Sequence, residues 1–301
     1  MPTLLDFRRR IRSVKNTQQI TRAMKFVSAA RLRRAQEAAL AARPYAHELV
    51  RVLRSIMTRI ESPEHPLLAH RPEERILTVV LAGERGLAGA FNTNILRDAF
   101  KFFRSRKGKK LVVIPVGKKC RDALRKAGME FAAEYVNVLA RVDFGVAREI
   151  AKIITDLYAE EKVDAVYIIF SEFKNVIAPN LVTEKLLPIE KIEVKEEKDG
   201  HPEAKEGKPA EGPAALVDYI YEQPPKVILD RLLPRYIETQ ILRAMLESSA
   251  AEHAARMTAM EAATKNAGDV IEGLTLHMNK VRQAAITKEI IEIVSGAAST
   301  A

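Results

Sequence analysis

The sequence predicts an α/β protein: a long antiparallel coiled coil of the N- and C-terminal helices plus a small central Rossmann-like parallel α/β domain. Two observations predict the coiled coil. Residues 3–43 contain neither proline nor glycine, and residues 235–301 contain no proline. A third observation predicts the central domain, because three apolar, β-branched runs of strand length alternate with helical stretches between the two ends.

The composition is that of a folded protein from a reducing compartment of the cell. The 301 residues are 47% hydrophobic and 29% charged, and no apolar run approaches the ~18 residues of a membrane span. Cys120 is the only cysteine, which excludes an internal disulfide and a multi-cysteine metal site. The first residues lack the apolar core of a signal peptide, so we expect a mature protein exposed to the cytoplasm.

The net charge of +10 is concentrated in the N-terminal segment. Residues 1–60 hold 14 Lys/Arg against 3 Asp/Glu, residues 61–234 hold 28 of each sign, and residues 235–301 hold 7 against 8. A segment this basic favours an acidic partner, which could be nucleic acid, anionic lipid or an acidic protein surface.

Residues 1–60 are expected to form the first long helix. Helix formers dominate the segment, and sixty helical residues would extend about 90 Å, far beyond the average globular helix. Helices of this length are normally paired. A 3-4 spacing marks the pairing seam, which begins apolar and becomes polar after Val14: Leu4, Phe7, Ile11, Val14, Gln18, Thr21, Lys25 and Ser28.

Residues 216–301 are expected to form the second long helix. Its C-terminal half carries a 3-4 seam of larger residues, namely Ile271, Leu274, Met278, Val281 and Ala285. Upstream, the predicted seam is built of small residues, which allow close helix approach: Ala244, Ser248, Ala251, Ala255, Thr258 and Ala262. We infer that the two ends of the chain pair as an antiparallel coiled coil whose seam is only weakly hydrophobic.

Residues 74–192 are expected to form the α/β domain. The predicted strands are RILTVVLAG, KLVVIPVG and VDAVYIIFSEF, and the predicted helices between them are NILRDAFKFFRSRK, CRDALRKAG and FGVAREIAKIITDLYAEEK. Residues 175–190 are expected to supply a further strand or two. Residues 193–215 are charged, contain proline and glycine and have almost no large apolar side chains, so they are expected to form a solvated, disordered loop.

The stretch LAGERGLAGAFNTN, residues 81–94, resembles a phosphate-binding loop because its glycines lie between a strand and a helix. It lacks the lysine of a Walker motif, and its spacing is G-x-x-G-x-x-G instead of G-x-G-x-x-G. We therefore interpret it as a tight strand-to-helix connection, with Asn92 or Thr93 as the helix cap. No nucleotide or other cofactor is expected.

Catalytic and metal chemistry find no support in the sequence. The six histidines are scattered without H-x-x-x-H spacing. Cys120 is interpreted as a structural cysteine at a helix start, because nothing in the sequence places a base beside it. No catalytic residue, metal ligand or cofactor-binding residue is predicted.

A basic helical nucleic-acid-binding protein is the alternative function class. The basic segment is its main support. Against it, the chain has no tryptophan, and the basic segment offers only Phe7, Phe26 and Tyr45 for base stacking. An interfacial membrane helix is also disfavoured, because the segment lacks a bulky apolar stripe.

Both ends of the chain resemble the γ subunit of the F-type ATP synthase. The resemblance rests on IRSVKNTQQITRAMKFVSAARLRRAQ near the N-terminus, on ERGLAGAFNTN in the middle and on the stretch from RYIETQILRAM to IVSGAA at the C-terminus. It implies a non-catalytic rotor shaft that couples proton-driven rotation to ATP synthesis or hydrolysis in a ring of three α and three β subunits. It also implies contacts of the α/β domain with the ε subunit and the c-ring of the membrane sector.

The resemblance implies six contacts with the β subunit. Met24 and Lys25, in TRAMKFV, match the place that faces an acidic lever loop of β, and Arg282 and Gln283, in NKVRQAAIT, match a pair that contacts a catch loop. Thr287 and Glu289 would join the second set. The alternatives are seam packing for Met24 and Gln283 and a solvated charge for Arg282.

Some features depart from the family or narrow the source. Position 88 is alanine where relatives often have cysteine, and a single cysteine excludes the dithiol of chloroplast relatives. With no transit peptide visible, we expect a bacterial protein, peripheral on the cytoplasmic side of the inner membrane and in contact with it only through the complex. The 193–215 loop is longer and more polar than the family implies.

Overall fold

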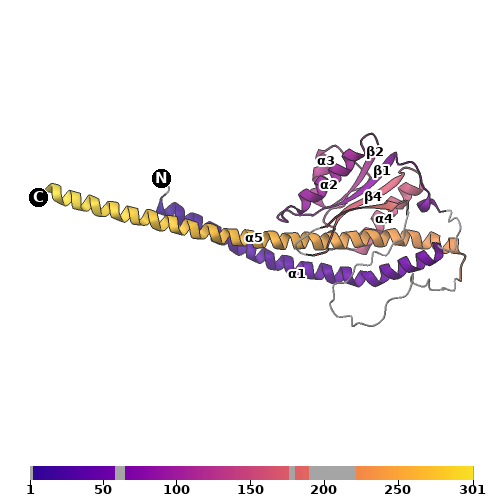
Figure 1. Ribbon diagram of the computed structural model, residues 1–301, viewed down its shortest axis with the longest axis horizontal. Coiled ribbons are helices and arrows are strands. Elements are labelled where there is room, and N and C mark those ends of the chain that lie inside the picture. Colours follow the sequence, from indigo (N-terminus) through magenta and orange to yellow (C-terminus); the bar gives the residue numbers. More distant parts are fainter. Residues whose placement is uncertain (1–2, 58–64, 176–179, 190–221, 301) are drawn as a thin grey trace, which may run out of the picture.

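Two long helices lie side by side, and a small α/β domain packs against them nearer one end (Figure 1). The computed structural model describes residues 3–57, 65–175, 180–189 and 222–300. Helix α1 spans Leu4–Met57 and helix α5 spans Pro225–Thr300, and each continues through an internal proline, Pro44 and Pro234. The predicted fold class is confirmed, while the 193–215 loop lies outside the described residues.

The two helices are antiparallel. The rings of Phe7 and His277 lie 5.0 Å apart, the hydroxyl oxygens of Thr21 and Thr264 lie 2.8 Å apart, and Lys25 Nζ lies 2.6 Å from Glu261 Oε1. Residue numbers thus fall along α5 as they rise along α1, which confirms the predicted antiparallel pairing. Polar contacts replace apolar packing in the middle of this seam.

The predicted seam of α1 is confirmed. All eight predicted positions are buried or half-buried, and Thr21 and Ser28 are among the most buried residues of the helix. In α5 the four predicted positions from Ile271 to Val281 are half-buried, whereas most of the residues between them are exposed. The fifth, Ala285, is half-buried too, but it lies beyond the start of α1 (Figure 1). Both segments therefore follow the heptad-like spacing read from the sequence.

The small-residue seam predicted upstream in α5 is partly wrong. Thr258 and Ala262 are exposed, and Ala251 packs in the core of the α/β domain. The residues that contact Leu32 of α1 are Ala250 and Ala254 instead. The physical reason is that this part of α5 is covered on two sides, by α1 and by the α/β domain, so its small residues do not mark a single stripe.

The central domain is a five-stranded sheet in the order β3-β2-β1-β4-β5. The first four strands in this order are parallel, and β5 pairs antiparallel with β4, so residues 175–190 contribute one antiparallel edge strand. The strands are β1 (Arg75–Leu81), β2 (Lys110–Val116), β3 (Glu130–Phe131), β4 (Ala165–Glu172) and β5 (Asn180–Leu187). The helices are α2 (Phe91–Ser105), α3 (Lys118–Lys126), α4 (Phe144–Ala159) and the 3-10 turn η1 (Pro66–Leu68).

The two faces of the sheet are covered by different helices. Helices α2 and α3 pack on one face, with Phe91, Ile95 and Leu124 in that core. The other face packs on α4, on the C-terminal part of α1 and on the N-terminal part of α5, and this core includes Leu53 and Leu233. The larger core is therefore shared between the domain and the coiled coil, and it attaches the domain to the coiled coil.

Candidate functional site

The C-terminal end of α5 extends beyond the start of α1 (Figure 1). The contact of Phe7 with His277 fixes the register, so Leu4 at the start of α1 lies opposite residues near 280. Residues 282–300 of α5 therefore project as a single helix, which we call the projecting end. Among the described residues, no other element of the chain packs on it.

The projecting end exposes several large apolar side chains to solvent. Ile290, Ile291, Ile293 and Val294 have exposed fractions of 55%, 59%, 70% and 62%. Exposed apolar surface of this extent on one element indicates a protein contact. The cations of the opposite helix start, Arg8, Arg9, Arg10, Arg12 and Lys15, are also exposed close to this end.

Four of the six predicted contact residues lie on the projecting end. Arg282, Gln283, Thr287 and Glu289 are all exposed. The Thr287 hydroxyl donates to the Gln283 carbonyl oxygen at 3.0 Å, so only its methyl group and the oxygen lone pairs remain for a partner. The structure leaves these residues available to another chain, and their contact with β stays a prediction.

Met24 and Lys25 lie within the paired part of the shaft. Both are half-buried, and the Met24 carbonyl oxygen accepts a hydrogen bond from Ser28 Oγ at 2.8 Å. Lys25 forms an ion pair with Glu261 of α5, and its side chain keeps an exposed fraction of 33%. Sequence reasoning missed this pair because the partner lies 236 residues away along the chain. The predicted contact of Lys25 with β also stays a prediction.

The loop between β1 and α2, residues 82–90, joins the α/β domain to the shaft. The Gly83 N–H donates to Asn92 Oδ1 at 2.8 Å, and Asn92 Nδ2 donates to the Arg85 carbonyl oxygen at 3.3 Å. The predicted capping role of Asn92 or Thr93 is therefore wrong: α2 begins at Phe91, and Asn92 holds the loop in place. The amide of Asn92 accepts from the Gly83 N–H and donates to the Arg85 carbonyl oxygen at the same time, whereas a helix cap would only accept from N–H groups of the helix.

The facing part of α5 presents a buried cluster of ionisable groups. Glu252, His253 and Arg256 have exposed fractions of 5%, 6% and 7%, and Arg256 pairs with Glu252. Burial raises the pKa of Glu252, although the Arg256 guanidinium opposes the shift. Burial and the neighbouring Arg256 lower the pKa of His253 to about 4, so its imidazole is neutral at physiological pH.

A second set of contacts fixes the start of α3. The buried carboxylate of Glu84 accepts hydrogen bonds from the Lys118 N–H at 3.0 Å and from the Val138 N–H at 3.1 Å. Helix α3 has no side-chain cap of its own at Gly117, so Glu84 supplies the missing acceptor from the neighbouring loop. This carboxylate therefore organises the segments that follow the carboxyl ends of the strands.

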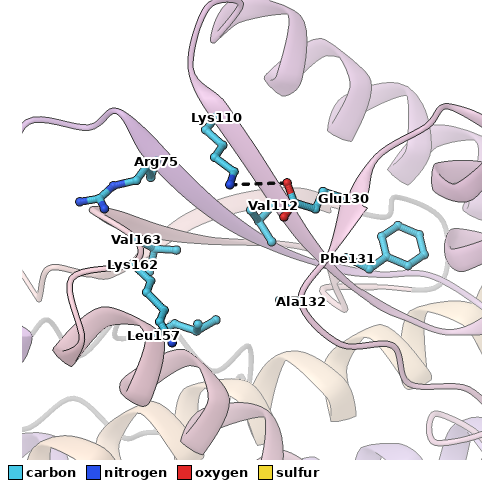
Figure 2. Close-up of a pocket in the computed structure, with 9 residues that line it drawn as sticks. All are labelled: Arg75, Lys110, Val112, Glu130, Phe131, Ala132, Leu157, Lys162 and Val163. Carbon is cyan, nitrogen blue, oxygen red and sulfur yellow. Dashed lines mark ion pairs between the residues drawn. The ribbon is translucent and has the colours of Figure 1, made fainter.

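A surface hollow lies at the side of the sheet where β1 and β2 begin (Figure 2). It has a volume of about 390 Å³, and its rim includes Arg75 and Lys110, the first residues of β1 and β2. Arg75 is paired with Asp164 at 2.7 Å, and Lys110 lies 3.8 Å from Glu130 (Figure 2). Doubly wound sheets bind ligands at the carboxyl ends of their strands, so this hollow is not in the position of a nucleotide site.

No group of three or more His, Cys, Asp or Glu side chains in the described part of the chain is arranged to hold a metal ion. No described helix combines the length and the apolar character needed to cross a membrane.

The outer layer of the domain carries a basic surface that the sequence reading missed. Residues 97–126 hold 12 Lys/Arg and 2 Asp/Glu, and α2 turns Arg97, Lys101 and Arg104 outward at helical spacing. The neutral total for residues 61–234 concealed it, because an acidic excess follows in the same segment. A charge count in a window of about thirty residues would have found it.

This structure defines a class of protein that works inside an assembly, because a long two-helix shaft has a projecting, unpaired end and carries an α/β domain to one side of its axis (Figure 1). Similarity to known proteins agrees with this class. A family model described as "ATP synthase" matches residues 3–300. The chain is 47% identical to the ATP synthase gamma chain of Solibacter usitatus and 46% identical to that of Pelotomaculum thermopropionicum, each over 99% of both chains. The chain belongs to the ATP synthase gamma chain family.

Solved structures show the same fold. A chain of the Euglena gracilis mitochondrial ATP synthase has a TM-score of 0.66 at 22% identity, and the match covers 99% of this chain and 94% of that chain. A chain from the central stalk and c-ring of the Tetrahymena thermophila mitochondrial ATP synthase has a TM-score of 0.59 at 22% identity, covering 81% and 99%. Family membership leaves the nucleic-acid-binding alternative without support.

Proposed function

We propose that the chain is the non-catalytic central shaft of a proton-translocating ATP synthase. The observation that carries this function is the projecting end of α5, an exposed single helix with apolar and charged side chains at the far end of a coiled coil. Such a helix suits the bore of a ring formed by three α and three β subunits. The nucleotide sites then belong to the ring and not to this chain.

The α/β domain sits away from the shaft axis, and it contacts the ε subunit and the c-ring of the membrane sector. The domain and the coiled coil share a core, so a rotation applied to the domain turns the shaft. A curved or asymmetric rod changes the conformations of its neighbours only through differences in contact energy between rotational positions. The exposed polar residues of the projecting end, with Met24 and Lys25, supply those differences at β.

The complex is peripheral on the cytoplasmic side of the inner membrane of a bacterium. The bacterial relatives named above support this location. The chain contacts the membrane only through its partners, and it binds neither nucleic acid nor a cofactor.

Partner dependence tests this function. The purified chain alone should show no ATP hydrolysis, and together with α and β subunits it should restore ATP-driven proton pumping when the membrane sector is present. Appreciable ATP hydrolysis by the isolated chain would contradict the proposal. Binding of DNA or RNA that weakens steeply with salt would instead favour the nucleic-acid-binding class.

Substituting the predicted contacts on the projecting end should weaken coupling without unfolding the shaft. Arg282→Ala and Gln283→Ala are each expected to cost about 1–2 kcal/mol of contact energy with β, or roughly 5- to 30-fold in the affinity of the chain for the ring. Binding of the chain to α and β subunits measures the change, and helicity measures folding.

Lys280→Ala is the matched control, because it removes an exposed charge from the same helix just before the projecting end. The control should bind as the unmodified chain does. Unchanged binding and unchanged coupling for both Arg282→Ala and Gln283→Ala, at unchanged helicity, would remove these residues from the contact.

A further inference from the structure

The shaft occupies the place where a doubly wound domain ordinarily binds its ligand. Such sheets bind ligands outside the carboxyl ends of the strands, at the point where the strand order reverses. Here the order β3-β2-β1-β4-β5 reverses between β1 and β4. Helix α5 lies against these strand ends, because its Glu252 side chain lies next to Gly83, two residues after the end of β1. The glycine loop after β1 therefore faces a helix of its own chain.

The contact between the loop and the shaft is polar and buried. An ideal Cβ atom at Gly83 would lie 2.9 Å from the Glu252 carboxyl carbon, so the loop backbone approaches this side chain as closely as a glycine allows. Arg256 pairs with Glu252, and its Nη2 lies 3.5 Å from the Gly86 carbonyl oxygen. The loop thus closes over an ion pair of α5 and supplies one of its acceptors.

The other side of the loop is fixed to the body of the domain. Asn92 holds Gly83 and Arg85, and the Lys119 N–H donates to the Gly83 carbonyl oxygen at 3.1 Å. A force on the domain therefore reaches Gly83 through α2 and α3. From the loop it passes to Glu252 through close packing at Gly83, and to Arg256 through the hydrogen bond to the Gly86 carbonyl oxygen.

We propose that the loop of residues 82–90 and the Glu252–Arg256 pair form a clamp that carries torque between the α/β domain and the shaft. This inference rests on the proposed function, since only a rotor needs such a junction. The shared apolar core holds the domain on the shaft, but apolar packing is non-directional, so a polar contact adds a defined register between the two. Displacing the loop would instead take the Gly86 carbonyl oxygen away from the buried Arg256 guanidinium of α5.

Variants of the ion pair test the clamp in the complete membrane-bound complex. Arg256→Gln and Glu252→Gln each leave one buried charge without its partner. We expect ATP hydrolysis within about twofold of the unmodified complex and a loss of at least about fivefold in protons pumped per ATP hydrolysed. Arg33→Gln is the matched control, because it removes an exposed cation of the shaft that pairs with Glu37 on its own helix, and it should pump normally.

An engineered crosslink tests the clamp without weakening the fold. An ideal Cβ atom at Gly89 lies 3.7 Å from the Ala259 Cβ atom of α5, a separation that suits a disulfide. Gly89→Cys with Ala259→Cys, oxidised in the otherwise native chain, should leave coupling unchanged, because the loop and the shaft already move as one body. Added to Arg256→Gln, the oxidised pair should restore coupling, and reduction should abolish it again. Gly89→Cys alone controls for strain at this left-handed residue.

Two results would overturn the clamp. One is normal proton pumping by Arg256→Gln and Glu252→Gln, and the other is a loss of coupling when the disulfide forms in the otherwise native chain. If the ion-pair variants fail to assemble, the crosslink in the native chain still decides the question. Failure of the unmodified chain to restore any pumping with α, β and the membrane sector would instead contradict the proposed function.

Discussion

Gly117→Ala is expected to destabilise the carboxyl edge of the sheet by at least about 4 kcal/mol, which is exceptional for a single substitution. Gly117 has a φ of +108°, and an ideal Cβ atom there lies 1.9 Å from the Ala82 carbonyl oxygen. That oxygen belongs to backbone that cannot move easily, because the Ala82 N–H donates to Val116 and the Gly117 N–H to Tyr135. Amide hydrogen exchange of β1 and β2 in the assembled complex measures the loss.

Gly108→Ala separates the two causes of this effect. Gly108 has a similar φ of +100°, but no atom lies within 4 Å of its ideal Cβ atom. Only backbone strain of about 1–3 kcal/mol is therefore expected at this position. Equal costs for Gly108→Ala and Gly117→Ala would show that the predicted collision with Ala82 is relieved, and the packing described at this edge would be wrong.

Glu84→Ala is expected to cost about 1–3 kcal/mol, because it leaves two partly buried N–H groups without an acceptor. The Glu84 side chain accepts from Lys118 and Val138, which belong to different elements of the domain. The loss should appear as faster amide exchange in α3 and in the segment around residue 138. The same substitution should also weaken the hold of the domain on the loop that contacts the shaft.

Glu84→Gln is the matched variant for this effect. The amide keeps one acceptor oxygen and replaces the other with a donor, so one N–H remains paired while the second faces an N–H₂ group. An intermediate cost is expected. If Glu84→Ala exchanged no faster than the unmodified chain, Glu84 could not be the group that fixes the start of α3.

Local patterns in the sequence predicted the elements of this fold well. The seam from Leu4 to Ser28 follows from 3-4 spacing alone, because a side chain's position on a helix depends only on its residue number. The strands β1, β2 and β4 follow from apolar runs of strand length. Each of these predictions needs information from fewer than about thirty neighbouring residues.

The failures share a physical cause, which is dependence on a partner distant in the chain. Thr258 and Ala262 have the right spacing for a seam, but α5 turns a different face to α1 because the α/β domain covers part of it. Asn92 has the right side chain for a helix cap, yet it bonds to Gly83 nine residues earlier. The antiparallel direction of β5 is equally invisible in its composition.

Some residues of the candidate site were predicted from the sequence, and others were missed. The resemblance identified Arg282, Gln283, Thr287 and Glu289, and the structure adds that they lie on a helix with no partner from the described residues. The Glu252–Arg256 pair was missed, because an i, i+4 pair of opposite charges ordinarily marks an exposed helix face. Only its burial beneath the glycine loop distinguishes it. The loop that resembled a phosphate cradle thus receives a carboxylate from its own shaft.

Rotation of the chain within its complex tests the central claim most directly. Lys107→Cys places a thiol on an exposed turn of the α/β domain, and the native Cys120 should not compete for the probe because its side chain is fully buried. With the α and β subunits fixed to a surface, a bead on this thiol should turn in one direction during ATP hydrolysis, pausing three times per revolution. A bead that stays fixed while ATP is hydrolysed at the normal rate would contradict the assignment of the chain as the shaft.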